Sequence, residues 1–202
     1  MNKKPKWVIF DVGQVLYDYK GFIKDSAKYL NINKEDLQNR FTEILITSEL
    51  GGLTFEEFWL GILRLQQKEH ELQNIMNMWW DIERYVKDTR LLLKELHDTN
   101  YSIALFSNNW PNMGKKILEI ISKDGVIKEF FESSVEKLRK PDIKFYELAE
   151  RKMGAKGKEI YFIDDKKENL ITANILGWQT FLYRLGKDGG KKSNDKIRKQ
   201  LL

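Results

Sequence analysis

The chain has no cysteine among its 202 residues and only two histidines. Without cysteine there is no disulfide framework, no thiol nucleophile and no thiolate metal site. The two histidines, His70 and His97, lie in segments with helical periodicity and lack a partner at metal-ligand spacing. We therefore expect both on helix surfaces and look for catalytic groups among carboxylates, hydroxyls, amides and lysines.

Long apolar runs are also missing. No window approaches the roughly eighteen apolar residues that a transmembrane helix needs. The basic, polar start of the chain is not followed by an apolar signal region. These absences predict no membrane partner and a cytoplasmic protein.

Excess charge is confined to the C-terminal end. The net charge is +5, but residues 186–202 hold six of the 35 basic and two of the 30 acidic residues, so 29 basic and 28 acidic residues remain elsewhere. The chain lacks a basic face interleaved with aromatic side chains, so we expect no nucleic-acid partner. The short basic tail is expected to be solvated and frayed.

The most informative stretch is the apolar run of residues 7–10, which stops at Asp11 and is followed by Gly13 in a turn. A continuous apolar run is typical of a strand buried on both faces of a parallel sheet. Further strands are expected from apolar segments that alternate with helical ones. The five predicted strands are residues 7–12, 101–106, 130–135, 159–163 and 180–183.

Residues 17–85 differ from the rest, because their apolar residues recur at spacings of three and four. That periodicity predicts amphipathic helices. Thr54 and Glu57 have the spacing of a capping box at a helix start. We predict an α/β fold with a Rossmann-like parallel sheet, in which residues 1–16 and 86–202 form the core and a four-helix cap is inserted at 17–85.

Polar residues follow the strands where they end. Right-handed crossovers bring the carboxyl ends of parallel strands to one edge of the sheet, which is where ligands bind in open α/β sheets. That edge would carry Asp11, Ser107 with Asn108, Lys140, and Asp164 with Asp165.

One chemistry accounts for this set. Converging carboxylates need a cation, and oxygen ligands with open positions suit Mg²⁺ together with a substrate phosphate. The hydroxyl, the amide, Lys140 and the N–H groups of the Val12–Gly13 turn would hold phosphate oxygens. Asp11 would face phosphorus as a nucleophile and form an aspartyl phosphate.

The sequence also resembles the haloacid dehalogenase-like hydrolase superfamily. The resemblance rests on the segments 10–16, 107–108, 140–142 and 162–165, with Asn169, Ala173 and Leu176-Gly177 following. The insert resembles the C1 type of helical cap found in its first subfamily. The resemblance implies a mobile cap and Mg²⁺-dependent phosphatase chemistry.

The resemblance also assigns roles by position. Asp11 resembles the nucleophile and Lys140 the lysine that pairs nucleophile and phosphate. Ser107 and Asn108 resemble the phosphate binders. Asp164 and Asp165 resemble the metal carboxylates, with Asp165 as the direct ligand. Asp11 and the Gly13 carbonyl are the further metal ligands implied.

Gly13 departs from the common family pattern, which has a second aspartate there as general acid and base. A subgroup resembling sugar-phosphate phosphatases also has glycine at this position, followed by an aspartate further on that Asp18 matches. A general acid is typically worth on the order of 10²–10⁴ in rate, so Gly13 implies weak protonation of the leaving group.

We therefore predict a Mg²⁺-dependent phosphomonoester hydrolase that acts on a small phosphorylated metabolite, with a sugar phosphate as one candidate. Two alternatives stay open: a 2-haloacid dehalogenase, and a catalytically impaired phosphate-binding or scaffold protein. The acid pair argues against the dehalogenase on metal chemistry. The sequence leaves a monomer and a homodimer equally open.

Tryptophans and one further aspartate complete the expectations. Trp59, Trp79 and Trp80 are expected to pack within the cap. Trp110 follows the Ser107–Asn109 loop. From that position it is equally expected to line the pocket or to pack elsewhere. Asp142 is expected to be a helix N-cap.

Overall fold

The computed structural model describes residues 4–121 and 125–202 and contains a five-stranded sheet in the order β3-β2-β1-β4-β5. All four strand pairings are parallel, with β1 in the centre. The predicted α/β fold with a parallel sheet is confirmed. The strands are β1 (Trp7–Phe10), β2 (Ser102–Ser107), β3 (Ile127–Glu132), β4 (Ile160–Asp164) and β5 (Gln179–Leu182).

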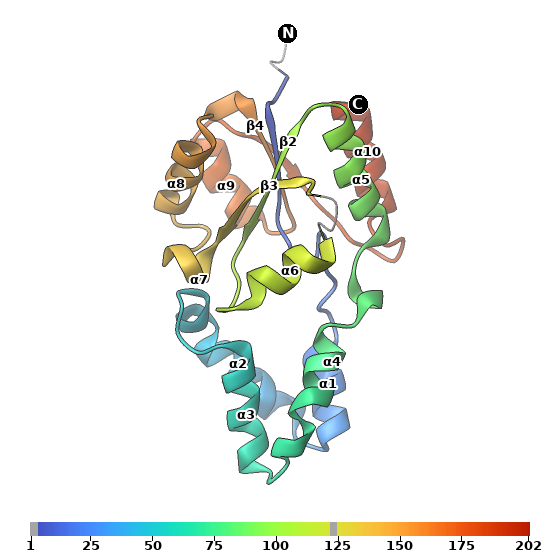
Figure 1. Cartoon of the computed structure of the whole chain (residues 1–202), viewed down its shortest axis with the longest axis vertical. Coiled ribbons are helices and arrows are strands. Elements are labelled where there is room, and N and C mark those ends of the chain that lie inside the picture. Colours follow the sequence, from blue (N-terminus) through green and yellow to red (C-terminus); the bar gives the residue numbers. More distant parts are fainter. Residues whose placement is uncertain (1–3, 122–124) are drawn as a thin grey trace.

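Helices cover both faces of the sheet (Figure 1). Successive side chains of a strand point to opposite faces, and β1 follows this rule, because Val8 and Phe10 belong to one buried apolar cluster and Trp7 and Ile9 to the other. The central strand is therefore buried on both sides, as its unbroken apolar run predicts. The helices are α5 (Lys87–Asp98), α6 (Met113–Ile121), α7 (Ser133–Glu136), α8 (Ile143–Met153), α9 (Lys167–Ile175) and α10 (Lys191–Leu201), with a 3₁₀ turn, η3 (Gly157–Glu159).

Four further helices come between β1 and α5 and lie together below the sheet in Figure 1. The capping box at the third of them is confirmed: the Glu57 N–H donates to Thr54 Oγ1, and the Thr54 N–H donates to Glu57 Oε2. These helices are α1 (Phe22–Leu30), α2 (Lys34–Glu49), α3 (Phe55–Leu65) and α4 (Leu72–Trp79), with 3₁₀ turns η1 (Glu69–Glu71) and η2 (Ile82–Arg84).

The third strand begins and ends earlier than predicted. It spans Ile127–Glu132, and part of the predicted segment 130–135 instead forms α7. Ser133 explains this ending, because its hydroxyl accepts a hydrogen bond from the Asn109 N–H (3.0 Å). A side chain that bonds a neighbouring loop competes with continuation of the strand.

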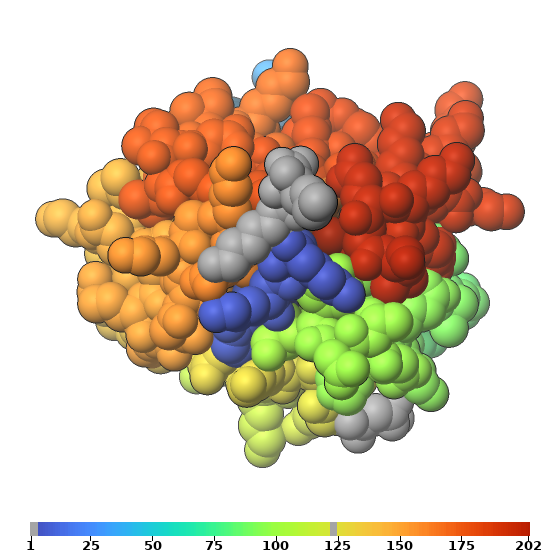
Figure 2. Space-filling view, turned by 90° about the horizontal axis from the view of Figure 1, so that it is seen from above, coloured from blue at the N-terminus to red at the C-terminus, as the bar shows by residue number. Residues whose placement is uncertain are grey.

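The C-terminal tail is a packed helix, so the prediction of a frayed tail is wrong. Ile197 is fully buried in α10. Arg198 donates from Nε to Glu95 Oε2 (2.6 Å), and Tyr101 donates to the Leu201 carbonyl (2.8 Å). Figure 2 shows the red α10 against the green segment near residue 100. Its few apolar residues fall on one helical face, and that face, rather than the net charge, decides its position.

In the described part of the chain, none of the helices is both long and apolar enough to cross a membrane.

Replacing Ile197 tests whether α10 is an integral part of the core. Ile197→Ala should lower the free energy of unfolding by about 2–5 kcal/mol, because it removes a fully buried side chain. The exposed neighbour on the same helix provides a control, and Lys196→Ala should change stability by less than about 0.5 kcal/mol. Denaturant unfolding measures both. Equal, small effects would show that the helix does not contribute to the core.

Candidate active site

Asp11 stands at the carboxyl end of the central strand. Its N–H donates to the Ile163 carbonyl of β4 (2.9 Å), which fixes the backbone where β1 ends. The chain then turns tightly, because the Val12 carbonyl accepts from the N–H groups of Leu16 and Tyr17. Within residues 4–121 and 125–202, no backbone hydrogen bond uses the N–H groups of Val12 and Gly13. These two donors remain available to a ligand.

Lys140 joins the strand ends through a buried ammonium group. Its Nζ donates to Asp11 Oδ1 (2.9 Å), to Asp164 Oδ2 (2.8 Å) and to the Phe106 carbonyl (2.6 Å). The Lys140 side chain is 1% exposed and the Asp164 side chain is fully buried. Three acceptors satisfy all three donors of the ammonium group, so the interaction links the ends of β1, β2 and β4.

Asn108 holds the backbone of this lysine. Its Nδ2 donates to the Lys140 carbonyl (2.9 Å), and its Oδ1 accepts from the Lys140 N–H (2.8 Å). One side chain thereby fastens the segment before α8 to the loop after β2. Phosphate binding by Asn108 stays a prediction, whereas the structure gives its side chain this positioning role.

Asp164 accepts hydrogen bonds from other groups besides Lys140. Oδ1 accepts from the Lys166 N–H (2.8 Å), and Asn169 Nδ2 reaches both carboxylate oxygens (3.1 and 2.9 Å). Both oxygens are therefore engaged. Asp165, in contrast, is only partly buried.

Asp11, Asp164 and Asp165 form one acidic cluster. One carboxylate oxygen from each can be chosen so that all lie within 4.8 Å of one another. Burial raises the pKa of Asp11 to about 7; Lys140 opposes the shift, and the Asp164 and Asp165 carboxylates add to it. Burial also raises the pKa of Asp165, and the negative charge of Asp164 raises it further. Three carboxylates around one ammonium leave excess negative charge, which suits a divalent cation.

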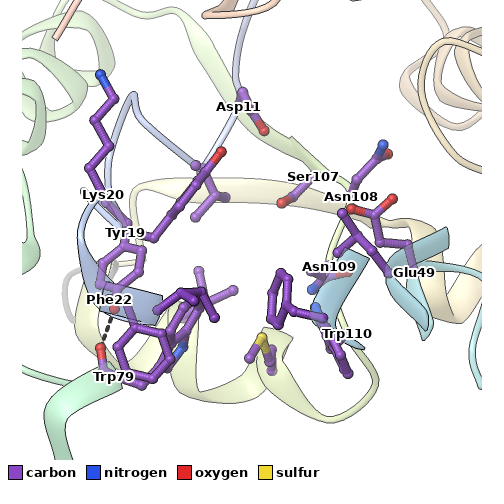
Figure 3. Close-up of a pocket in the computed structure, with 18 of the residues that line it drawn as sticks. Asp11, Tyr19, Lys20, Phe22, Glu49, Trp79, Ser107, Asn108, Asn109 and Trp110 are labelled. Carbon is purple, nitrogen blue, oxygen red and sulfur yellow. Dashed lines mark hydrogen bonds between the residues drawn. The ribbon is translucent and has the colours of Figure 1, made fainter. Parts of the chain in front are cut away.

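A cavity of about 520 Å³ opens beside this cluster (Figure 3). Its polar end consists of Asp11, Ser107, Asn108 and Lys140. The turn after β1 contributes Val12 and Gly13, so all predicted phosphate-binding residues line the same cavity. Figure 3 shows aromatic side chains of the inserted helices on the opposite side.

Tyr19 occupies the space beside Gly13. A side chain at Gly13 would place its Cβ 2.8 Å from Tyr19 Cε1. The Tyr19 hydroxyl points toward Asp11 in Figure 3, and burial raises its pKa, with the Asp165 and Asp11 charges adding to the shift. The tyrosine therefore stays protonated near neutral pH, and its hydroxyl group can donate one hydrogen bond as well as accept.

Asp18 does not match the role that its sequence position implies. Its Oδ1 accepts from Gln14 Nε2 and from the Lys20 N–H (both 2.9 Å), and Asp18 does not line the cavity. It stabilises the loop after β1 and does not face the leaving group. Asp142 is confirmed as an N-cap, since its Oδ1 accepts from the Lys144 N–H (3.0 Å).

The tryptophans divide between packing and the cavity wall. Trp59 is fully buried in the insert, as predicted. Trp79 and Trp80 line the cavity as well as packing in the insert, and Trp110 lines it while 4% exposed. Tyr19, Phe22 and Phe41 line the cavity as well, although none of them was predicted to do so. The helical spacing of Phe22 and Phe41 indicates only a buried face and cannot separate a core position from a cavity wall. Tyr19 lies in the loop before α1, where no such spacing exists.

Comparisons with known proteins agree with this geometry. The model of a protein family described as "haloacid dehalogenase-like hydrolase" matches residues 5–177. A sesquiterpene phosphatase of Aspergillus oryzae is 26% identical over an alignment of 183 residues, which covers 85% of this chain and 86% of that protein.

Solved structures share the fold at lower identity. A HAD family enzyme of Bacteroides thetaiotaomicron, in complex with magnesium and inorganic phosphate, is 23% identical with a TM-score of 0.72, over 93% of this chain and 98% of that chain. An L-2-haloacid dehalogenase is 17% identical with a TM-score of 0.71, over 97% of this chain and 100% of that chain. Both establish the architecture and leave the reaction to be argued from the residues.

Proposed function

Because the chain belongs to the haloacid dehalogenase-like hydrolase family, we propose that it is a Mg²⁺-dependent phosphomonoester hydrolase with Asp11 as the nucleophile. The observation that carries this proposal is the buried Lys140 ammonium shared by Asp11 and Asp164, with Asp165 beside them. The phosphatase relative and the neighbour that binds magnesium and phosphate support the same chemistry.

The donor set fits Mg²⁺. Asp11 and Asp165 each have a carboxylate oxygen that accepts no hydrogen bond from another described side chain, so these oxygens can bind a metal ion. We assign the Gly13 carbonyl as the third metal ligand. Asp164, whose oxygens are engaged, orients the cluster and adds negative charge. Mg²⁺ bound here would neutralise the charge of the phosphate and of the attacking carboxylate.

The residues can carry out phosphoryl transfer in two steps. Lys140 holds Oδ1 of Asp11, while Oδ2 accepts no hydrogen bond from the residues that the structure describes. Oδ2 would attack phosphorus, and the bond from phosphorus to the leaving oxygen would break; solvent water would then protonate the released oxygen anion. Water would then attack phosphorus, releasing phosphate and restoring the carboxylate.

Donors at the polar end would hold the phosphate. The Ser107 hydroxyl, the remaining amide hydrogen of Asn108 and the N–H groups of Val12 and Gly13 surround the same end of the cavity. Lys140, whose three donors are engaged, adds positive charge there. They are fixed by the sheet before the substrate arrives, so little reorganisation is needed in the transition state. We assign residues 17–85 the role of a cap over this end.

The dehalogenase alternative has less support. A haloacid carries one carboxylate and needs no cation, whereas this site groups three carboxylates around one ammonium. The excess negative charge would repel an anionic substrate unless a metal ion is bound. The impaired-scaffold alternative would leave the complete set of nucleophile, lysine and acid pair without a role.

Replacing the nucleophile tests the proposal directly. Asp11→Asn should lower phosphatase activity on an aryl phosphate by several orders of magnitude, because the amide cannot form the acyl phosphate. Asp142→Asn is the matched control, because it makes the same change at an exposed N-cap where asparagine caps equally well. Substantial turnover by Asp11→Asn would rule out covalent catalysis at this residue.

Metal binding can be measured without turnover. Mg²⁺ at a hundredfold excess over its dissociation constant should stabilise the native protein by about 2.7 kcal/mol, which raises the melting temperature by a few degrees. Asp165→Ala should remove most of that increase. Glu168→Ala, an exposed acid three residues further along, should keep it. Equal Mg²⁺ shifts in both variants would place the metal elsewhere.

The glycine at position 13 predicts a strong dependence on the leaving group. With no carboxylate there, kcat/KM should fall as the pKa of the leaving alcohol rises, and aryl phosphates should be better substrates than simple alkyl phosphates. Asp18→Asn should leave this slope unchanged, because Asp18 is outside the cavity. A flat dependence with chemistry limiting the rate would mean that another residue protonates the leaving oxygen.

A further inference from the structure

The cavity extends well beyond the polar end. Its volume of about 520 Å³ is in the range of small-molecule sites, whereas the phosphate-binding groups are gathered at one end. The opposite side is apolar, and we call it the apolar chamber. Its wall consists of Phe22, Phe41, Trp79, Trp110, Met113 and Ile117.

The wall of the apolar chamber is assembled before any ligand binds. Phe22 and Trp79 pack edge to face with ring centres 4.8 Å apart, and the rings of Phe41 and Trp110 are 5.4 Å apart. Phe55 lies behind both pairs, 4.5 Å from Trp79 and 5.5 Å from Trp110. Aromatic pairs at these separations are favourable beyond the area they bury, so these contacts stabilise the wall.

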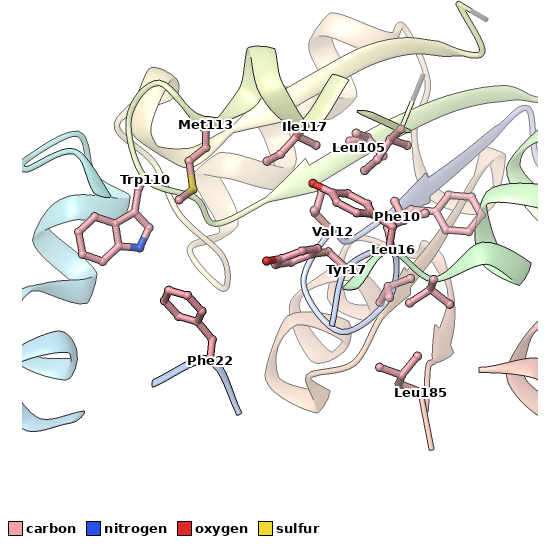
Figure 4. Close-up of a cluster of buried hydrophobic side chains, with 14 of the residues drawn as sticks. Phe10, Val12, Leu16, Tyr17, Phe22, Leu105, Trp110, Met113, Ile117 and Leu185 are labelled. Carbon is pink, nitrogen blue, oxygen red and sulfur yellow. The ribbon is translucent and has the colours of Figure 1, made fainter. Parts of the chain in front are cut away.

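Two segments far apart in sequence build this chamber. Figure 4 shows Met113 on α6 with Trp110 and Phe22 around the same space. Met113 and Ile117 are one helical turn apart, so both face the cavity from α6. Phe41 comes from α2 of the insert and is only partly buried. The exposed part of its ring can therefore contact a ligand.

Three polar side chains that line the cavity are already engaged, and Lys20, Lys24 and Lys34 line it as well. Asn109 Nδ2 donates to Glu132 Oε2 (2.8 Å), and Glu49 Oε2 accepts from Arg139 Nε (2.8 Å). Gln38 Nε2 bonds Thr42 Oγ1 (3.3 Å) on its own helix. A sugar would need several convergent donors and acceptors here, and its buried hydroxyls would otherwise lose their hydrogen bonds to water.

From this arrangement we propose that the enzyme selects phosphate monoesters whose organic part is a large apolar group, which fills the apolar chamber while the phosphate binds at the polar end. This inference rests on the proposed phosphatase function. Of the substrates open from the sequence, it disfavours a sugar phosphate and favours a phosphate ester of a hydrophobic alcohol or phenol. The apolar area that the ligand removes from water would supply the selectivity.

Aryl phosphates with matched leaving groups test the proposal. Phenyl phosphate, 4-butylphenyl phosphate and 4-(glucosyloxy)phenyl phosphate all release a phenol, so they differ mainly in what enters the chamber. The butyl ester should have a kcat/KM at least about tenfold above that of phenyl phosphate, because its methylenes become buried. The glucosyl ester should be no better than phenyl phosphate.

The outcomes separate the two proposals. If the three esters are hydrolysed with Mg²⁺ at equal efficiency, or the glucosyl ester is the best, the apolar chamber does not select the substrate, although the phosphatase proposal stands. If none is hydrolysed with Mg²⁺, the phosphatase proposal fails and the substrate inference fails with it.

Variants locate the selectivity in the chamber. Phe41→Ala and Met113→Gln should each reduce the ratio of kcat/KM for the butyl ester to kcat/KM for phenyl phosphate by about fivefold or more. The first variant removes apolar contact area. The second places a polar amide of similar size in the apolar wall. Ile46→Ala is the control, because Ile46 lies on the same helix as Phe41, is 55% exposed and does not line the cavity. Melting temperatures confirm folding. Ratios unchanged in both chamber variants would overturn the proposal.

Discussion

The candidate site depends on one buried ammonium group. Lys140 Nζ lies between Asp11, Asp164 and the Phe106 carbonyl. The same nitrogen is 5.3 Å from the ring centre of Phe106 and 5.3 Å from that of Phe162. Burial alone would lower the pKa of Lys140, but the two carboxylates raise it above its usual value. Removing the lysine would leave the fully buried Asp164 carboxylate without its counter-ion, which is strongly destabilising. The ion pairs therefore hold the strand ends together, and the proposed phosphoryl transfer depends on that arrangement.

The same charges explain why the cavity has two unlike ends. Near Lys140 the acidic residues exceed the single cation, so this end favours a metal ion together with an anionic ligand. Away from it, the side chains of Phe41, Trp79 and Met113, from α2, α4 and α6, form an apolar wall. A phosphate ester with an apolar organic group matches both ends at once. In our proposal, the strand ends carry out the reaction and the inserted helices select the organic group attached to the phosphate.

Much of this organisation could be predicted from the sequence. The apolar run before Asp11 predicts a central buried strand, and the polar residues after later strands predict one shared edge; the structure brings Asp11, Lys140 and Asp164 together as expected. The chemistry assigned to them remains a proposal. The predictability has a simple cause, because parallel strands with right-handed crossovers leave only one edge for their carboxyl ends.

The remaining features depend on tertiary contacts. The tail reads as polar by composition, yet Ile197 is fully buried. The third strand ends early because of a hydrogen bond between Ser133 and Asn109, which are 24 positions apart. Phe41 has the spacing of a core residue, and only the packing of α2 against Trp110 shows that it borders a cavity. Asp18 has the expected position in the sequence, but its hydrogen bonds turn it toward the loop.

The most direct test of the central claim is to trap the covalent intermediate. Mixing the protein with Mg²⁺ and an aryl phosphate, quenching with acid and reducing with borohydride converts an aspartyl phosphate into homoserine. Trypsin then releases residues 7–20, which contain both Asp11 and Asp18. Tandem mass spectrometry should find homoserine at position 11 and unmodified aspartate at position 18. An unmodified peptide from a sample quenched during rapid turnover, or homoserine at position 18, would contradict the account.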